Sequence, residues 1–172
     1  MRLHQHALVL AAGALCLQAA PCQGPESTQV FSALTGVSMT VFAEDGPAGY
    51  PCEPFACAPH HVQANLGSVL PVEIYGRRGT FYALLGGMPT LGCQPIGGIG
   101  GALALGSPAF TLGFGPISDL PQGAACDVGV GQTSFAVPAG ASIDMAFRLQ
   151  GASFSVMDGG LVFTRAVEVR VW

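Results

Sequence analysis

The chain contains no lysine, and charged residues of either sign make up only 9% of its 172 residues. Its six basic residues are all arginines, its ten acidic residues outnumber them, and the formal net charge is −4. Proteins that bind nucleic acid or anionic lipid need clustered basic side chains, yet the only neighbouring basic pair here is Arg77 and Arg78. We therefore expect neither nucleic acid nor an anionic membrane as a partner.

The chain also lacks an apolar run of the roughly 20 residues that a transmembrane helix needs. The longest run, residues 7–17, follows a short positive start at Arg2 and is followed by small residues, which is typical of an export signal. This predicts a signal peptide over 1–22, with cleavage after Ala19 or after Cys22 both open. We expect residues 23–172 to form one domain, with no membrane span after signal removal, located outside the cell, in the periplasm or on the cell surface.

Four cysteines remain after the predicted signal peptide, namely Cys52, Cys57, Cys93 and Cys126. In an exported chain an even set of cysteines predicts disulfides, here two, and four cysteines allow three pairings. We favour the pairing of Cys52 with Cys57, which closes a short loop, and of Cys93 with Cys126, which closes a longer loop around a glycine-rich stretch. The crossed pairings stay open.

No stretch shows the spacing of a long amphipathic helix, whereas alternation of apolar and polar residues recurs throughout. It is strictest at 143–150 and 167–171. Residues 70–75 and 81–85, joined across Gly76–Gly79, predict a hairpin. The proline-rich stretch 44–65 is predicted to be an irregular loop.

About eight short strands without intervening helices favour an all-β, antiparallel β-sandwich, immunoglobulin-like or jelly-roll-like. From about Cys52 onward the chain contains, in order, YALLGG, GCQPIGGIGGALALG, DVGVGQ leading to SFAVPAG, FRLQGASF and GLVFTRAVEVRV. In this order the motifs resemble a β-domain found in exported proteins of planctomycete-type bacteria. The resemblance implies a β-sandwich outside the cytoplasm and no catalytic residues; residues 23–51 fall outside it.

His60 and His61 are the only histidines after the predicted signal peptide. With Cys57 or Glu53 they are weak candidates for a zinc site. Adjacent residues rarely bind the same ion, however, and thiols in an oxidising compartment would be bridged. We expect an exposed loop pair of histidines, no metal site and no other cofactor.

Other catalytic patterns are missing as well. No segment has the G-x-S-x-G pattern of a nucleophile elbow. The glycine run 97–101 lacks the lysine, serine or threonine of a phosphate-binding loop, so its glycines are expected to allow positive φ or close backbone approach. Glu73, Asp144 and Glu168 alternate with apolar residues and are expected on solvated strand faces. The absence of these patterns predicts that the chain is not an enzyme.

Exposed aromatic side chains are the usual platform of sugar-binding sandwiches. We expect Tyr50 and Tyr75 as ligand-binding residues, with Phe55, Tyr82 and Trp172 as further contacts, and most phenylalanines inside. The leading hypothesis is a non-catalytic structural or interaction module, contacting a surface protein or polysaccharide. The alternatives are a carbohydrate-binding module that uses these aromatics and, more distantly, a metal-dependent hydrolase at His60 or His61.

Overall fold

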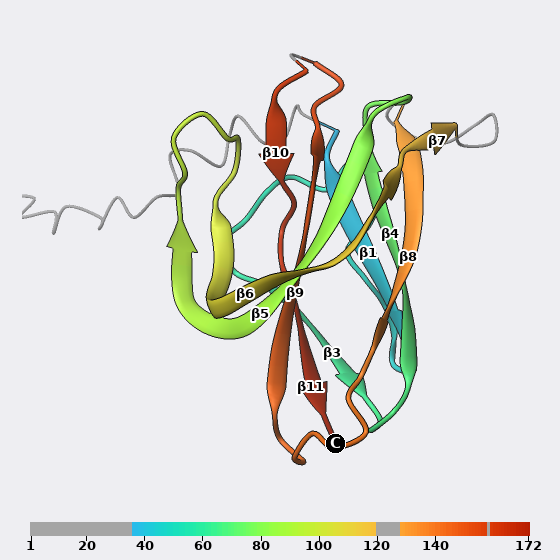
Figure 1. Ribbon diagram of the computed structural model, residues 1–172, viewed down its shortest axis with the longest axis vertical. Helices are drawn as coiled ribbons and strands as arrows, with labels where there is room; N and C mark the ends of the chain where they lie inside the picture. The colour runs from blue at the N-terminus through green and yellow to red at the C-terminus, as the bar shows by residue number, and fades with distance from the viewer. Residues whose placement is uncertain (1–35, 120–127, 158) are drawn as a thin grey trace, which may run out of the picture.

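The computed structural model describes residues 36–119, 128–157 and 159–172, and all regular structure in these ranges is strand. The strands form two sheets that pack together as a sandwich (Figure 1). The predicted all-β fold is therefore confirmed. The predicted signal peptide and Cys126 lie outside the described residues. No helix capable of crossing a membrane is found within the described ranges.

The first sheet has five strands in the order β2-β1-β4-β8-β7, and all its pairs are antiparallel. Its strands are β1 (Ser38–Ala43), β2 (Gly46–Ala48), β4 (Val69–Gly76), β7 (Ser118–Asp119) and β8 (Gly129–Ala136).

The second sheet has the order β3-β11-β9-β5-β6, and β10 pairs with β9 beside this path. Among the pairs of named strands in this sheet, only β3 with β11, at the edge, is parallel. Its strands are β3 (His60–Ala64), β5 (Phe81–Gln94), β6 (Leu103–Pro116), β9 (Ala146–Phe154), β10 (Leu161–Phe163) and β11 (Val167–Val171).

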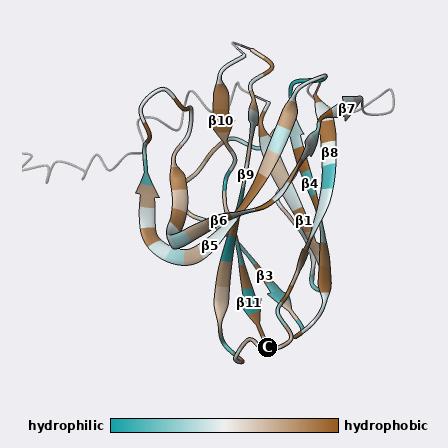
Figure 2. Cartoon of the chain, in the orientation of Figure 1, coloured by the Kyte–Doolittle hydropathy of each residue, from teal (hydrophilic) through white to brown (hydrophobic). Residues whose placement is uncertain are grey.

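The core lies between the two sheets and consists of the apolar members of the alternating pattern. Val41 and Ile74 from the first sheet and Leu149 and Val169 from the second are fully buried in one cluster. The strands accordingly show alternating hydrophobic and hydrophilic bands in Figure 2. Alternation with a period of two places every second side chain in this core, as the sequence predicted for 167–171.

The predicted hairpin between 70–75 and 81–85 is wrong, because β4 belongs to the first sheet and β5 to the second. Residues 77–80 cross from one sheet to the other. The crossing is held by hydrogen bonds from the Gly79 amide to the Ile117 carbonyl, 3.1 Å, and from the Ile117 amide to the Thr80 carbonyl, 2.8 Å. Strand β4 pairs with β1 and β8 instead.

Strands β5 and β6 form a long hairpin, which Figure 1 shows curving away from the rest of the second sheet. The glycine run 97–101 lies between these strands. Gly98 and Gly101 have φ of +80° and +72°, and a Cβ on Gly101 would lie 2.9 Å from the Phe163 carbonyl oxygen. Both reasons expected for these glycines, positive φ and close backbone approach, are therefore confirmed.

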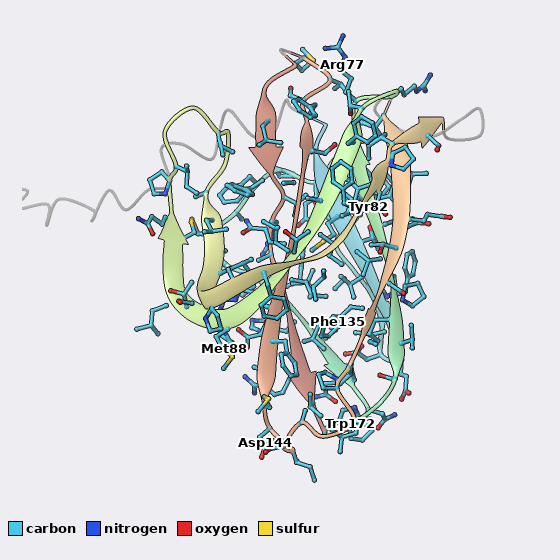
Figure 3. The ribbon with its side chains drawn as sticks, in the orientation of Figure 1. Arg77, Tyr82, Met88, Phe135, Asp144 and Trp172 are labelled. Carbon is cyan, nitrogen blue, oxygen red and sulfur yellow. A yellow bond between two sulfur atoms is a disulfide. The ribbon has the colours of Figure 1, made fainter. Side chains whose placement is uncertain are left out.

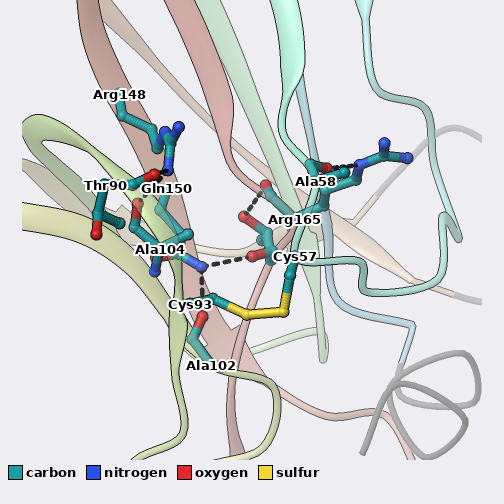
Figure 4. Close-up of a disulfide and its surroundings, with 10 residues drawn as sticks. Cys57, Ala58, Thr90, Cys93, Ala102, Ala104, Arg148, Gln150 and Arg165 are labelled. Atoms are coloured by element: carbon teal, nitrogen blue, oxygen red, sulfur yellow. Dashed lines mark hydrogen bonds between the residues drawn. A yellow bond between two sulfur atoms is a disulfide. The ribbon is translucent and has the colours of Figure 1, made fainter. Parts of the chain in front are cut away.

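The disulfide in Figure 4 joins Cys57 to Cys93, so the favoured pairing of Cys52 with Cys57 and of Cys93 with Cys126 is wrong. Strand β5 extends to Gln94, beyond the predicted end at residue 85, and brings Cys93 next to the segment before β3. Cys52 is disulfide-bonded as well, but not to Cys57. The bridge ties the β5–β6 hairpin to the chain that leads into β3.

Candidate functional site

The stretch 44–65, predicted to be a loop, contains β2 and β3, and the two histidines open β3. In the parallel register with β11, His61 lies opposite Glu168 and Gln63 opposite Arg170. Because successive side chains of a strand point to opposite faces, His60 faces inward and His61 outward. The prediction that both histidines lie in a loop is therefore wrong, because they lie on a strand. The prediction that His60 is exposed is wrong as well, because its side chain faces inward.

On the inward side, His60 contacts the buried carboxylate of Glu53. The distance from His60 Nε2 to Glu53 Oε1 is 2.5 Å, and Arg165 Nη1 donates to the same oxygen at 2.8 Å. Arg165 Nε also donates to the Ala58 carbonyl at 2.6 Å (Figure 4). These contacts hold the segment before β3 in place, and they leave Glu53 with two partners for its buried charge.

On the outward side, Glu168 is the centre of a second group of charged side chains. Its carboxylate lies 2.9 Å from Arg148 Nη2, 3.4 Å from Arg170 Nη2 and 3.5 Å from His61 Nδ1. Burial acts to raise the pKa of Glu168, but the hydrogen bond and charge of Arg148, together with the charges of His61 and Arg170, lower it below its ordinary value. The prediction that Glu168 lies on a solvated face is wrong, since the residue is buried.

The β5–β6 hairpin covers the Arg148 side of this outward group. Arg148 Nη1 donates to the carbonyls of Thr90 at 2.8 Å and Ala104 at 3.0 Å (Figure 4). Gln150, also on β9, donates to the Ala102 carbonyl at 2.8 Å and accepts from the Ala104 amide at 2.9 Å. Buried polar groups need such partners, so β9 and the hairpin that covers it are fixed together.

An open cleft of about 370 Å³ lies beside this group, lined by Asp45, His61, Val62, Gln63 and Arg170. It lies between the β1–β2 turn and the edge of the second sheet, where Asp45 Oδ2 accepts a hydrogen bond from the Gln63 amide at 3.2 Å. The His61 and Arg170 side chains are 66% and 60% exposed. The cleft thus offers donors and acceptors to a ligand from solvent.

Trp172 continues the same edge. Its amide donates to the Ala64 carbonyl at 3.2 Å, which extends the pairing of β11 with β3 by one step. Alternation along β11 places Trp172 on the side of Arg170. Its side chain is 58% exposed, and Figure 3 shows it at the end of the sandwich opposite Arg77. We call the following set the β3–β11 face: Asp45, His61, Gln63, Arg170 and Trp172.

The two tyrosines predicted to bind a ligand have different environments. Tyr50 is exposed, and its role in binding stays a prediction. Tyr75 is only 5% exposed, so the expectation of an accessible ring is wrong. Its hydroxyl donates to Glu73 at 2.5 Å, and burial together with this hydrogen bond raises the pKa of Tyr75 to about 12. Phe55 and Tyr82, the further contacts expected, are buried too.

The exposed phenylalanines were not expected, because most were predicted to face inward. Phe81 on β5 and Phe114 on β6 stack with ring centroids 5.3 Å apart, and Phe114 is 69% exposed. Strand β6 is the edge of the second sheet opposite β3. This sheet therefore has exposed aromatic side chains at its β6 edge and at the end of β11, next to β3.

His60 and His61 contact different carboxylates on different faces of β3, so their rings do not converge. Within the ranges that the structure describes, no three histidine, cysteine, aspartate or glutamate side chains gather closely enough to hold a metal ion.

No family model matches the chain, and no curated protein matches its sequence. Among solved structures it is similar to entomopoxvirus fusolin, a protein that enhances virulence and crystallises in vivo into viral spindles. The identity is 14%, the TM-score is 0.38, and the match covers 69% of this chain but 39% of fusolin. The chain thus spans less than half of fusolin's length, and a likeness this distant bears on neither activity nor ligand.

Proposed function

We propose that the chain is an exported, non-catalytic binding module that contacts its partner through the β3–β11 face. The observation that carries this proposal is the open cleft between Asp45 and Arg170, whose exposed His61 and Arg170 contact Glu168, which is itself held by Arg148. Contacts with this fixed pair keep the recognition groups in position before the ligand arrives, which lowers the entropy lost on binding.

Export is supported by two features. The N-terminal residues have the pattern of a signal peptide, and Cys57 and Cys93 form a disulfide, which persists in oxidising compartments. The resemblance of the motifs to an exported planctomycete-type domain agrees with this location, which we propose to be extracellular, periplasmic or at the cell surface.

A non-catalytic role is supported by the partners of the buried carboxylates. A general acid or base must exchange a proton near the working pH. Glu168 is held ionised by Arg148, which lowers its pKa, and Glu53 is engaged by both Arg165 and His60. Both carboxylates are thus engaged by partners within the protein, and these contacts join strands and loops.

Site-specific photo-cross-linking tests this proposal without assuming the chemistry of the partner. A photoreactive amino acid replaces exposed Gln63 on β3 or, as a matched control, exposed Thr111 on β6 at the opposite sheet edge. The folded protein is then irradiated with the envelope and extracellular fractions of the cells that produce it. We expect adducts from position 63 and none from position 111; no adduct at position 63, or equal yields at both positions, contradicts the proposal.

A further inference from the structure

We infer that the ligand of the β3–β11 face is a neutral polysaccharide, an inference that rests on the function proposed above. The first indication that the ligand is neutral comes from the charges of the cleft. Asp45 and Arg170 contribute opposite charges to its lining, and the adjoining carboxylate of Glu168 is paired with Arg148. The cleft therefore has no excess of one charge that would attract a polyanion or a polycation, whereas each of these would meet one like charge, which opposes binding.

The exposed groups of the cleft are hydrogen-bonding groups. A carboxylate accepts, a guanidinium donates, and the Gln63 amide and His61 ring can each do both. A ligand with many hydroxyls, each of which donates and accepts, can satisfy all of them. An apolar peptide or a lipid chain would instead remove water from these groups without replacing its hydrogen bonds, which is unfavourable.

Trp172 supplies the apolar part of the surface. A sugar ring has an apolar C–H face and a hydroxyl-bearing edge, so it matches a planar indole beside polar side chains. Trp172 is two residues beyond Arg170, which corresponds to roughly 7 Å along the strand. The face therefore presents its polar groups and then an aromatic ring along the direction of the strand.

The length and openness of the face favour a polysaccharide chain over a single sugar as the ligand. His61 lies opposite Glu168, and Trp172 follows Glu168 by four residues, which is roughly 13 Å along an extended chain. Asp45, His61, Gln63 and Arg170 are all exposed, so the cleft is not an enclosed pocket. A polysaccharide can pass across such a surface and contact the cleft and the indole with neighbouring sugar rings.

The test is binding of the purified full-length exported protein to insoluble cellulose, chitin and β-1,3-glucan, with alginate as a polyanionic comparison. Trp172→Ala removes the ring but keeps the amide that pairs with Ala64, and Gln63→Ala keeps the amide that pairs with Asp45. Phe114→Ala is the matched control, since it removes a ring that is no less exposed, 69% against 58% for Trp172, at the β6 edge of the sheet. Unchanged melting temperatures show that each variant is folded.

We expect the wild type to bind at least one neutral polysaccharide in preference to alginate. Trp172→Ala and Gln63→Ala should each weaken that binding at least tenfold, and Phe114→Ala should change it less than twofold. Binding to no neutral polysaccharide, with cross-links still forming at position 63, overturns the inferred ligand class alone. Polysaccharide binding that Trp172→Ala and Gln63→Ala leave unchanged, without cross-links at position 63, overturns the ligand site and the proposed function together.

Discussion

Arg148 on β9 and Glu168 on β11 form an ion pair of 2.9 Å in which the two residues are only 5% and 7% exposed. The same guanidinium binds the carbonyls of Thr90 and Ala104, so one side chain connects two neighbouring strands with the hairpin that covers them. Glu168 also reaches His61 and Arg170. This pair therefore links the interior of the second sheet to the β3–β11 face.

Arg148→Ala should lower the free energy of unfolding by about 3–5 kcal/mol, because it leaves a buried carboxylate without its main partner. Urea unfolding measures this loss. Arg77→Ala, at an exposed position, is the control and should change stability by less than about 0.5 kcal/mol. Replacing both partners by apolar residues, Arg148→Met with Glu168→Leu, should recover much of the loss. Equal stability of the two single variants would disprove this role for Arg148.

The stability of the protein should fall in acid through Glu168. Its pKa is lower in the folded protein than its ordinary value of 4.5, so the folded state binds fewer protons than the unfolded state between the two values. The stabilisation is fully present above about pH 4.5 and is lost as the pH falls through the folded pKa. Melting temperatures from pH 3 to 7 should therefore depend less on pH in Glu168→Gln; the same dependence in both proteins would contradict this assignment.

Removal of the Cys57–Cys93 bridge should cost about 3–4 kcal/mol, the expectation for a loop of this length, since the bridge spans 36 residues. The double variant Cys57→Ser, Cys93→Ser should also expose the β5–β6 hairpin to proteases, because the bridge attaches the hairpin to the segment before β3. Unfolding curves and limited proteolysis measure both effects. Non-reducing peptide mapping is the control, and a peptide joining Cys57 to Cys52 would show that the pairing is different.

Gly131 on β8 should not tolerate a side chain. A Cβ there would lie 2.1 Å from Tyr82 Cδ1, and the buried tyrosine is fixed by its hydroxyl, which donates to the Gln132 carbonyl at 2.8 Å. Gly131→Ala should destabilise the protein by about 1–3 kcal/mol, as overpacking does. Gly140→Ala is the matched control, because a Cβ at Gly140 would meet no other part of the chain within 4 Å. Thermal unfolding compares the two, and similar melting temperatures would argue against this packing.

The sequence predicts the strands and the fold class because alternation with a period of two is a local property. It does not predict which strands pair. The segment 76–80 suits a tight hairpin turn, yet it crosses between sheets, and β4 pairs with β1 and β8 instead of β5. Glu168 was expected on a solvated strand face, but it is buried, and its main partner Arg148 is distant in sequence.

The candidate site was harder to predict than the fold. Asp45 and Gln63 come from a proline-rich stretch with little periodicity, and β3 is only five residues long. The alternation of Val62 and Ala64 with His61 and Gln63 was a signal for this strand that the prolines around it obscured. Trp172 was named among the possible contacts, but its place beside Arg170 and Gln63 depends on the parallel pairing of β11 with β3, which follows from long-range packing.

Tryptophan fluorescence tests the binding face most directly, because Trp172 is the only tryptophan of the chain and no substitution is needed. A soluble oligosaccharide, prepared from the polysaccharide that the protein retains, is titrated while calorimetry measures binding independently. We expect the emission of Trp172 to change and to saturate in parallel with the heat of binding. Emission that stays constant while binding saturates would show that the ligand lies elsewhere and would contradict the β3–β11 face as the site of recognition.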